Sequence, residues 1–172
     1  VEYALGLPYN SLNIDDPRNI FQVKLDWLRL FNDNRWLLLP SMELVKRIFD
    51  GHKINQDITT LYDDARTFRY RFVPLGPRRI MSLLRQSRSS VNDASLDADR
   101  NSELIDYPFT NLPELESHVY PHWAILNAGR KLFCHWDRTF TTLTNHVSKA
   151  YGVPTPEAVE FLKNIEAIYE RW

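Results

Sequence analysis

Residues 13–33 read NIDDPRNIFQVKLDWLRLFND and combine three kinds of local structure in direct succession. The Asp and Pro residues at 15–17 favour a turn, and the apolar residues at 20–23 predict a short strand. The residues from 25 onward predict a helix that packs on a core. The side chains expected to fill that core are Leu25, Trp27, Leu28, Leu30 and Phe31.

The length and composition favour one folded domain. The chain has 172 residues, of which 44% are hydrophobic and 13% aromatic, and this is ample for a packed core. We expect a single domain over 1–172, with a first part at 1–85, a mobile loop rich in Ser, Asp and Asn at 86–106 and a helical part at 107–172. The only cysteine, Cys134, excludes an intrachain disulfide and a zinc cluster of several cysteines.

Nothing in the sequence predicts contact with a membrane. No apolar run approaches the ~18–20 residues that span a bilayer, and the first ten residues lack the basic residues and the long apolar core of a signal peptide. Together with the single cysteine, these features predict an intracellular protein, cytoplasmic or nuclear. Because the chain begins at Val1 without a methionine, we expect it to be a trimmed piece of something longer.

Two strands and a helix are predicted after the opening stretch. RWLLLP at 35–40 is a short apolar run that predicts a strand ended by Pro40, and Ser41 can cap the helix that follows. At 67–74, TFRYRFVP alternates aromatic residues with arginines, which is typical of a half-buried strand. Residues 78–86 fit a strand or a helix. We prefer a strand, joined to 67–74 in a β-hairpin.

The last third of the chain predicts helices. The proline-bracketed residues 107–113 are expected to form an extended connector. A helix can begin at Pro121, and apolar residues recur at helical spacing up to a stop at Gly152. A further helix begins with Thr155 as its cap. The predicted fold class is therefore α+β, with small strands early and a C-terminal helical group.

The opening stretch resembles part of a known nuclease family. It is similar to the second half of the HNH-nuclease-like domains of fungal, basidiomycete-type proteins. The residues that carry this similarity are Asp15-Asp16-Pro17-Arg18-Asn19, then Ile20-Phe21-Gln22-Val23, Asp26 and Phe31-Asn32-Asp33. VEYALGLPYNSLN at 1–13 resembles the first strand and loop of that family, and LESHVYPHWAILNAGRKL at 115–132 resembles a C-terminal block. The resemblance implies a small ββα-metal-like element, elaborated here by the β-hairpin and the C-terminal helices.

The resemblance also implies which residues perform the chemistry. Asn19 would orient the hairpin, Asp26 would contact a divalent metal ion such as Mg or Zn, and Arg29 would contact a phosphate. The family also uses two histidines, which would fall near Ala4 and at Leu28, and this chain has neither. The expectation is a non-catalytic derivative that retains a binding function, with an active metal-dependent endonuclease as an open alternative.

Basic charge is concentrated in one stretch. Residues 65–92 contain seven arginines and no acidic residue, whereas acidic residues outnumber basic ones on both sides. Arginines suit phosphate contacts, and interleaved aromatic residues can stack on bases. The alternative is that the arginines pair with the acidic flanks, which depends on whether residues 93–116 cover them. The candidate residues for binding DNA or RNA are Arg66, Arg69, Arg71, Arg78, Arg79, Arg85 and Arg88.

Two further functions stay open on sequence alone. His118 and His122 are spaced i, i+4, so on one helix they would point at the same metal ion in a repurposed enzyme. Pro121 between them disfavours a helix through both, and the alternative is a capping or packing role. A protein-interaction or scaffold module would instead show an exposed apolar patch. The candidates for that patch are Trp27, Trp36 and Trp172.

Overall fold

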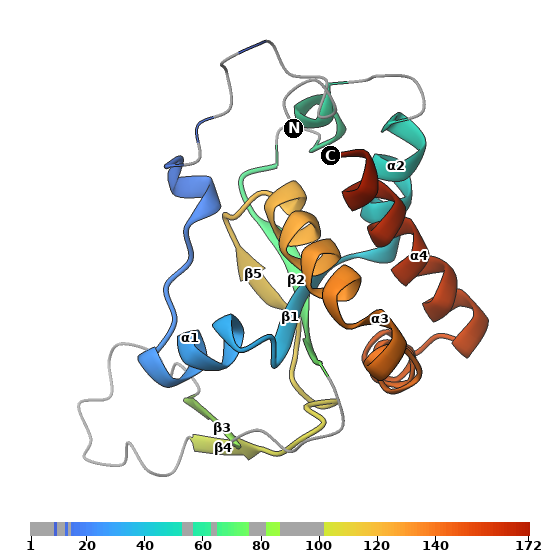
Figure 1. The fold of residues 1–172 in the computed structure, drawn as a ribbon. Coiled ribbons are helices and arrows are strands. Elements are labelled where there is room, and N and C mark those ends of the chain that lie inside the picture. Colours follow the sequence, from blue (N-terminus) through green and yellow to red (C-terminus); the bar gives the residue numbers. More distant parts are fainter. Residues whose placement is uncertain are drawn as a thin grey trace.

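The computed structural model describes residues 9, 13, 15–52, 57–62, 65–75, 82–86 and 102–172. Its strands lie mainly in the first two thirds, and its two longest helices lie at the C-terminal end (Figure 1). The class is therefore α+β, as predicted. In chain order the elements are η1 (Pro17–Asn19), α1 (Leu25–Asn32), β1 (Trp36–Pro40), α2 (Met42–His52), η2 (Ile58–Tyr62), β2 (Phe68–Pro74), β3 (Leu83–Gln86), β4 (Ser102–Ile105), β5 (Leu115–Ser117), α3 (Pro121–Tyr151) and α4 (Thr155–Arg171).

The main sheet has three antiparallel strands in the order β1-β2-β5. β1 is the apolar run predicted at 35–40, and four of its five residues are buried. In β2 the predicted alternation holds in the first part, where Phe68 and Tyr70 are buried and Arg69 is exposed, but it ends at Phe72 and Val73, which are both buried. β2 pairs with β1 through its last five residues and with β5 through its first three residues.

α3 covers the sheet, and α4 and α2 complete the main core. α3 contacts both β1 and β2, and α4 contacts α3 and α2, so α4 lies between these two helices (Figure 1). The core includes fully buried aliphatic side chains from the sheet and from all three helices. Among the described residues, no helix carries an apolar stretch long enough to cross a membrane.

The helix ends follow the predicted local signals. The backbone N–H of Leu44 donates to the Ser41 hydroxyl at 3.2 Å, so Ser41 caps α2 as expected. α3 begins at Pro121 and ends at Gly152, whose φ of 67° is the left-handed conformation that glycine adopts most easily. α3 is one continuous helix of 31 residues. The cap of α4 is Pro154, one residue before the predicted Thr155.

A second, smaller core lies under α1 and is rich in aromatic side chains. Trp27 of α1 contacts the ring of Phe72 in an edge-to-face arrangement, with the ring centroids 5.6 Å apart. Trp36 stacks on Phe72 at 5.0 Å and donates its indole N–H to the Trp27 carbonyl at 3.1 Å. Edge-to-face and offset contacts of this kind add to the gain from apolar burial, so α1 is held mainly by aromatic packing.

The structure corrects the predicted core face of α1. Leu25 and Leu28 were expected to be buried, but they are 61% and 41% exposed. Residues three and four apart share a face of a helix, and α1 turns Trp27, Leu30 and Phe31 toward the aromatic core. Leu25 and Leu28 therefore lie together on the solvent side.

Two predicted strand arrangements are also corrected. Residues 20–24 form an open connection instead of a strand, and Phe21 is held by ring contacts with Phe31 and Trp36. The described residues 82–86 do not pair with β2, which is bonded by β1 at 70–74 and by β5 at 68–70. β3 instead pairs with β4, so the end of the predicted loop at 86–106 is a strand. The first strand that the family resemblance expects lies outside the described residues.

Candidate functional site

The residues that the nuclease resemblance selects do not lie in one place. Asp26 and Arg29 are three positions apart in α1 and both are exposed, so they share one face of that helix. Asn19 ends η1, and the open connection at 20–24 separates it from α1 (Figure 1). Five extended residues span up to ~17 Å. The structure thus brings Asp26 and Arg29 together but leaves Asn19 apart from them.

Asn19 is positioned by the corner between β5 and α3. The backbone N–H of Tyr120 donates to the Arg18 carbonyl at 2.8 Å, and the Arg18 guanidinium hydrogen-bonds to the Tyr120 hydroxyl and lies 4.8 Å from the centre of its ring. A ring nitrogen of His118 is 3.1 Å from the Pro17 carbonyl oxygen. These contacts, made across about a hundred residues of sequence, fix η1 beside the start of α3.

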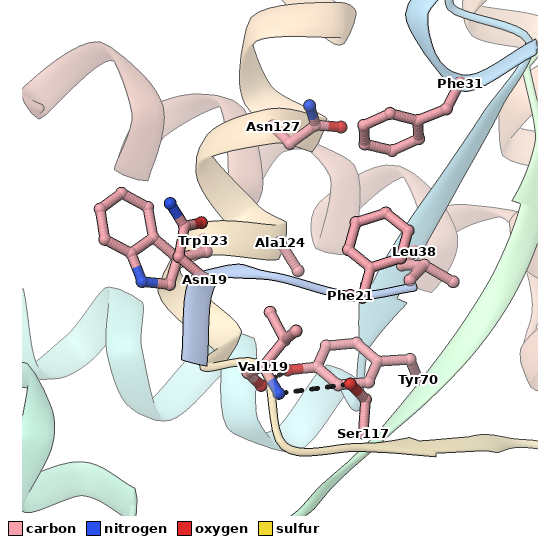
Figure 2. A pocket seen from close by; sticks show the side chains of 10 residues that line it. All are labelled: Asn19, Phe21, Phe31, Leu38, Tyr70, Ser117, Val119, Trp123, Ala124 and Asn127. Atoms are coloured by element: carbon pink, nitrogen blue, oxygen red, sulfur yellow. Dashed lines mark hydrogen bonds between the residues drawn. The ribbon is translucent and has the colours of Figure 1, made fainter. Parts of the chain in front are cut away.

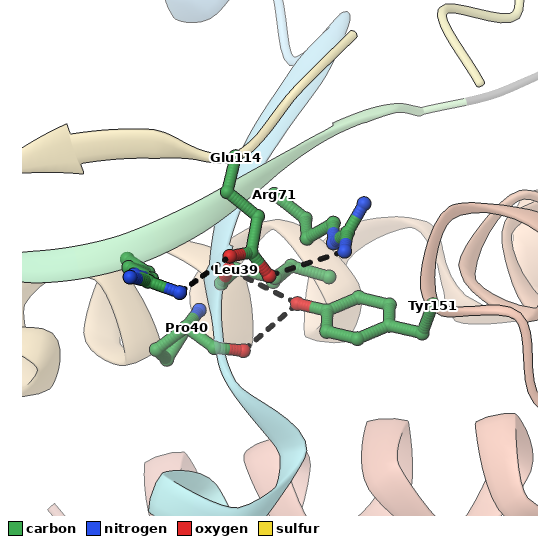
Figure 3. A network of polar contacts seen from close by, with 6 residues as sticks. Leu39, Pro40, Arg71, Glu114 and Tyr151 are labelled. Atoms are coloured by element: carbon green, nitrogen blue, oxygen red, sulfur yellow. Dashed lines mark hydrogen bonds and ion pairs between the residues drawn. The ribbon is translucent and has the colours of Figure 1, made fainter. Parts of the chain in front are cut away.

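The arginines of β2 pair with an acidic residue that precedes β5. Glu114 contacts Arg71 at 3.1 Å and Arg69 at 3.7 Å (Figure 3). Further along, Glu116 of β5 accepts a hydrogen bond from Thr67. Opposite charges facing each other across paired strands stabilise a sheet modestly. For these two arginines, the alternative of pairing with the acidic flank is therefore the arrangement that the structure contains.

The other candidate arginines are only partly described. Arg66 is exposed just before β2. Arg85 belongs to β3, but its side chain is outside the described part of the structure, and Arg78, Arg79 and Arg88 lie outside it altogether. The Arg69 side chain keeps 78% of its surface exposed despite its contact with Glu114. Arg66 and Arg69 are thus the described members of the predicted set that are most open to a ligand.

Arg71 also has a structural environment that the sequence did not indicate. Its guanidinium lies 5.8 Å from the centre of the Tyr151 ring, near the end of α3. The Tyr151 hydroxyl is 3.0 Å from the Leu39 carbonyl oxygen and 2.8 Å from that of Pro40 (Figure 3), and burial raises the Tyr151 pKa. Arg71, Tyr151 and Glu114 therefore tie the end of β1 to α3 and to β5.

His118 and His122 do not form a metal-binding pair. α3 begins at Pro121, so His118 lies outside the helix, whereas His122 is in its first turn and only 3% exposed. The Nδ1 atom of His122 is 2.7 Å from the Tyr62 hydroxyl, and burial lowers the His122 pKa to about 4. In the described part of the chain, no group of three or more His, Cys, Asp or Glu side chains is arranged to hold a metal ion. His122 is thus a neutral packing residue near pH 7.

A cavity of about 150 Å³ lies between η1, the main sheet and α3. Aromatic rings form much of its wall, and two carboxamides, those of Asn19 and Asn127, reach it from η1 and α3 (Figure 2). Tyr70, one of the aromatic residues, donates its hydroxyl hydrogen to the Val119 carbonyl at 2.5 Å. The hydroxyl is thereby fixed, and burial raises the Tyr70 pKa. The aromatic wall residues are Phe21, Phe31, Tyr70 and Trp123.

Sequence reasoning selected two lining residues: Asn19 as a site residue and Tyr70 as one of the aromatic residues between the arginines. The other residues come from segments that are distant in sequence, and no spacing joins them. Trp123 and Asn127 are four residues apart and so share one face of α3, which is the only local signal that could have grouped them. The cavity is a tertiary feature with apolar walls and a few polar groups, as small-molecule sites generally are.

Comparison with known proteins adds no family to this picture. No family model matches the chain, and no curated protein and no solved structure is significantly similar to it. The chemistry of the site therefore has to be argued from its own residues.

Proposed function

We propose that this chain is a non-hydrolytic domain that binds single-stranded nucleic acid, with the cavity between Asn19 and Asn127 taking one unpaired base. The observation that carries the proposal is the combination of aromatic walls and two carboxamides in one cavity. A cavity of this volume accommodates a benzene-sized ring. Proteins that read unpaired bases stack them on aromatic side chains and hydrogen-bond their edges with amide groups.

Exposed cations beside Asn19 in η1 and near the start of β2 support contact with the phosphate backbone. Arg18 directly precedes Asn19 and is exposed, and Arg66 and Arg69 are exposed at the start of β2. Arginine is suited to phosphate because its guanidinium can donate two parallel hydrogen bonds. Glu114 competes with phosphate for the β2 arginines, which predicts binding of modest affinity.

The absence of hydrolysis is the second part of the proposal. The position at which the HNH-like resemblance expects a helix histidine is Leu28, and Asn19 lies away from Asp26 and Arg29. A metal-dependent nuclease needs a base and a metal ligand around one phosphate. The separated positions favour an HNH-like domain without hydrolytic activity.

Binding to single-stranded oligonucleotides, measured by fluorescence anisotropy over a salt series, tests the proposal. We expect single strands to bind more tightly than the duplex of the same sequence, with affinity falling as salt rises. Asn127→Ala should weaken binding by about 5- to 150-fold, because a lost base contact is worth ~1–3 kcal/mol. Asn145→Ala, at an exposed position of the same helix, is the matched control. Equal binding by Asn127→Ala and by the unaltered chain would refute the base site.

A nicking assay tests the second part. Supercoiled plasmid incubated with the protein and Mg²⁺ or Zn²⁺ should stay intact, and the purified protein should carry less than one equivalent of either metal. Nicking that is abolished by Asp26→Ala would overturn the non-hydrolytic assignment, because Asp26 would then hold a catalytic metal ion.

A second function, protein binding, is favoured by one specific observation. Trp36 is buried and Trp27 and Trp172 are partly buried, so the three tryptophans do not form the predicted patch. Ile20, Leu25 and Leu28 are instead exposed along one segment, and contiguous exposed apolar groups mark contact surfaces. Leu25→Ser with Leu28→Ser should leave oligonucleotide binding unchanged and abolish any concentration-dependent self-association seen by analytical ultracentrifugation.

A further inference from the structure

Of the lysines in the described part of the chain, one is buried: Lys131, in the middle of α3. The residue is 4% exposed, which is unusual because lysine is almost never fully buried without a partner. Its Nζ atom lies 3.3 Å from the centre of the Phe31 ring and 6.0 Å from that of Trp36. It also donates to the Trp36 carbonyl at 3.1 Å. No carboxylate takes part in these contacts.

Two positions around Nζ are occupied by other groups of the structure. A tetrahedral amine nitrogen has three positions besides its bond to carbon; one faces the Trp36 carbonyl and one faces the Phe31 ring. A neutral amine fills these two positions with its two N–H bonds, which leaves its lone pair free. Lys131 also lines a cavity of about 260 Å³ that is distinct from the proposed base site, although both cavities touch Phe31 and Asn127.

The electrostatic environment keeps this amine reactive near neutral pH. Burial, with a smaller contribution from the Arg130 charge, lowers the Lys131 pKa to about 7. Two elements pack against the Lys131 amine: α1 contributes the Phe31 ring, and β1 contributes the ring and the carbonyl of Trp36. The charged neighbour that acts on the amine is Arg130, on α3 itself. A lysine that is desolvated and lies beside a second cation is the arrangement that activates lysine nucleophiles.

We propose that Lys131 is a nucleophilic amine that condenses reversibly with a small carbonyl compound carrying a carboxylate or phosphate group. The Nζ lone pair attacks the carbonyl carbon, so that a C–N bond forms, the C=O π bond breaks and one proton passes from the nitrogen to the oxygen. The hydroxyl group then leaves as water with the second proton of the nitrogen, which gives the imine, so the step needs no oxidant or reductant. The anionic group of the ligand would meet the Arg130 guanidinium. The other lining residues are Phe31, Asn32, Asn34, Asn127 and Cys134.

This inference is independent of the proposed nucleic-acid function, and it is tested on the full chain without nucleic acid. The probe is glyoxylate, an aldehyde with a carboxylate, in the presence of cyanoborohydride, which adds hydride to the imine carbon and locks the adduct as a secondary amine. The labelled site is mapped by peptide mass spectrometry. Propanal, an aldehyde without charge, is the comparison probe.

At pH 7 about half of the Lys131 side chains are neutral, against roughly one in 2,500 for an exposed lysine. We therefore expect glyoxylate to label Lys131 at least about tenfold faster than Lys163, which is exposed, even after burial slows access. Labelling of Lys131 at or below the rate of Lys163 would overturn the proposal, and this comparison within one protein needs no variant.

Two variants separate the parts of the proposal. Lys131→Met keeps an apolar side chain against Phe31 and should remove the fast-labelled site while the labelling of Lys163 persists. Arg130→Gln keeps the amine and should reduce the preference for glyoxylate over propanal at Lys131 by several-fold. An unchanged preference in Arg130→Gln, or equal labelling by both aldehydes in the unaltered chain, would overturn the recognition of an anionic group.

Discussion

Substituting Lys131 by Met should change how the stability of the fold depends on pH. Folding lowers the Lys131 pKa to about 7, whereas an exposed lysine in the unfolded chain has a pKa of ~10.4. Between these two values the unfolded state binds more protons than the folded state, so the free energy of unfolding rises with pH. Below about pH 7 both states are protonated, and the full cost of burying the charge remains. Lys131→Met removes this dependence because it has no proton to bind.

The magnitude follows from the two pKa values. One pKa unit corresponds to ~1.36 kcal/mol, so the unaltered chain should gain about 2–2.5 kcal/mol of unfolding free energy between pH 7.5 and pH 9.5 relative to Lys131→Met. Urea denaturation at four pH values in this window, followed by circular dichroism, measures the gain. The comparison between the two proteins cancels the contribution of other titratable groups to the pH dependence. These groups include the buried tyrosines, whose pKa values are raised by burial.

A second lysine variant serves as the control. Lys163→Met, at an exposed position of α4, should show the same pH dependence as the unaltered chain. Parallel stability curves for the unaltered chain and Lys131→Met would refute the reasoning, since they would mean that Lys131 is solvated and keeps an ordinary pKa. That result would also remove the electrostatic basis for the proposed amine chemistry.

Three further substitutions test packing and charge. Gly129→Ala should lower the free energy of unfolding by about 2–3 kcal/mol in urea denaturation. The added Cβ would come 2.3 Å from the Tyr169 Cβ atom of α4 and force α3 and α4 apart, which outweighs the better helix propensity of alanine. The control is Asn145→Ala, which is exposed on the same helix and should change the free energy of unfolding by less than ~0.5 kcal/mol. Tyr62→Phe should lower the free energy of unfolding by about 1–3 kcal/mol in the same assay, because the Nδ1 atom of His122 loses its hydrogen-bond partner. An unchanged free energy of unfolding would show that this hydrogen bond contributes nothing. Glu114→Gln should strengthen oligonucleotide binding and steepen the slope of its salt dependence by about one for each additional phosphate that the freed arginines bind; an unchanged slope would count against phosphate binding by the β2 arginines.

Features governed by local physics were predictable from the sequence. The alternation in β2, the Ser41 cap and the left-handed Gly152 each depend on a few neighbouring residues. The pairing of strands was not predictable in the same way, because β5 has only three residues, Leu115–Ser117, and none is buried. A strand without an apolar face leaves no periodic signal, so its pairing with residues 68–70 of β2 could not be predicted from the sequence.

The two cavities were predictable only in part. The lining of the base site joins residues near 20, near 70 and near 120, and proximity across such separations cannot be derived from spacing. Lys131 did leave a signal, because it follows Ala124 by seven residues and Ala128 by three, and so lies on the apolar face of α3. Burying a charged residue at a core position of a helix costs free energy unless its surroundings stabilise the charge, so such a position is a candidate for a functional role.

The exposure of Leu28 bears on how the resemblance to nucleases should be interpreted. If the apolar residue at this position filled the core, packing alone would account for it. Leu28 is 41% exposed and lies one turn from Leu25, which is 61% exposed, so neither leucine gains much from burial within this chain. A histidine at position 28 would therefore remove little buried apolar surface from the core, so the packing of the fold is compatible with histidine there. The two leucines instead form an apolar strip on the same helix as Asp26 and Arg29, which favours a contact surface on α1 over a hydrolytic one.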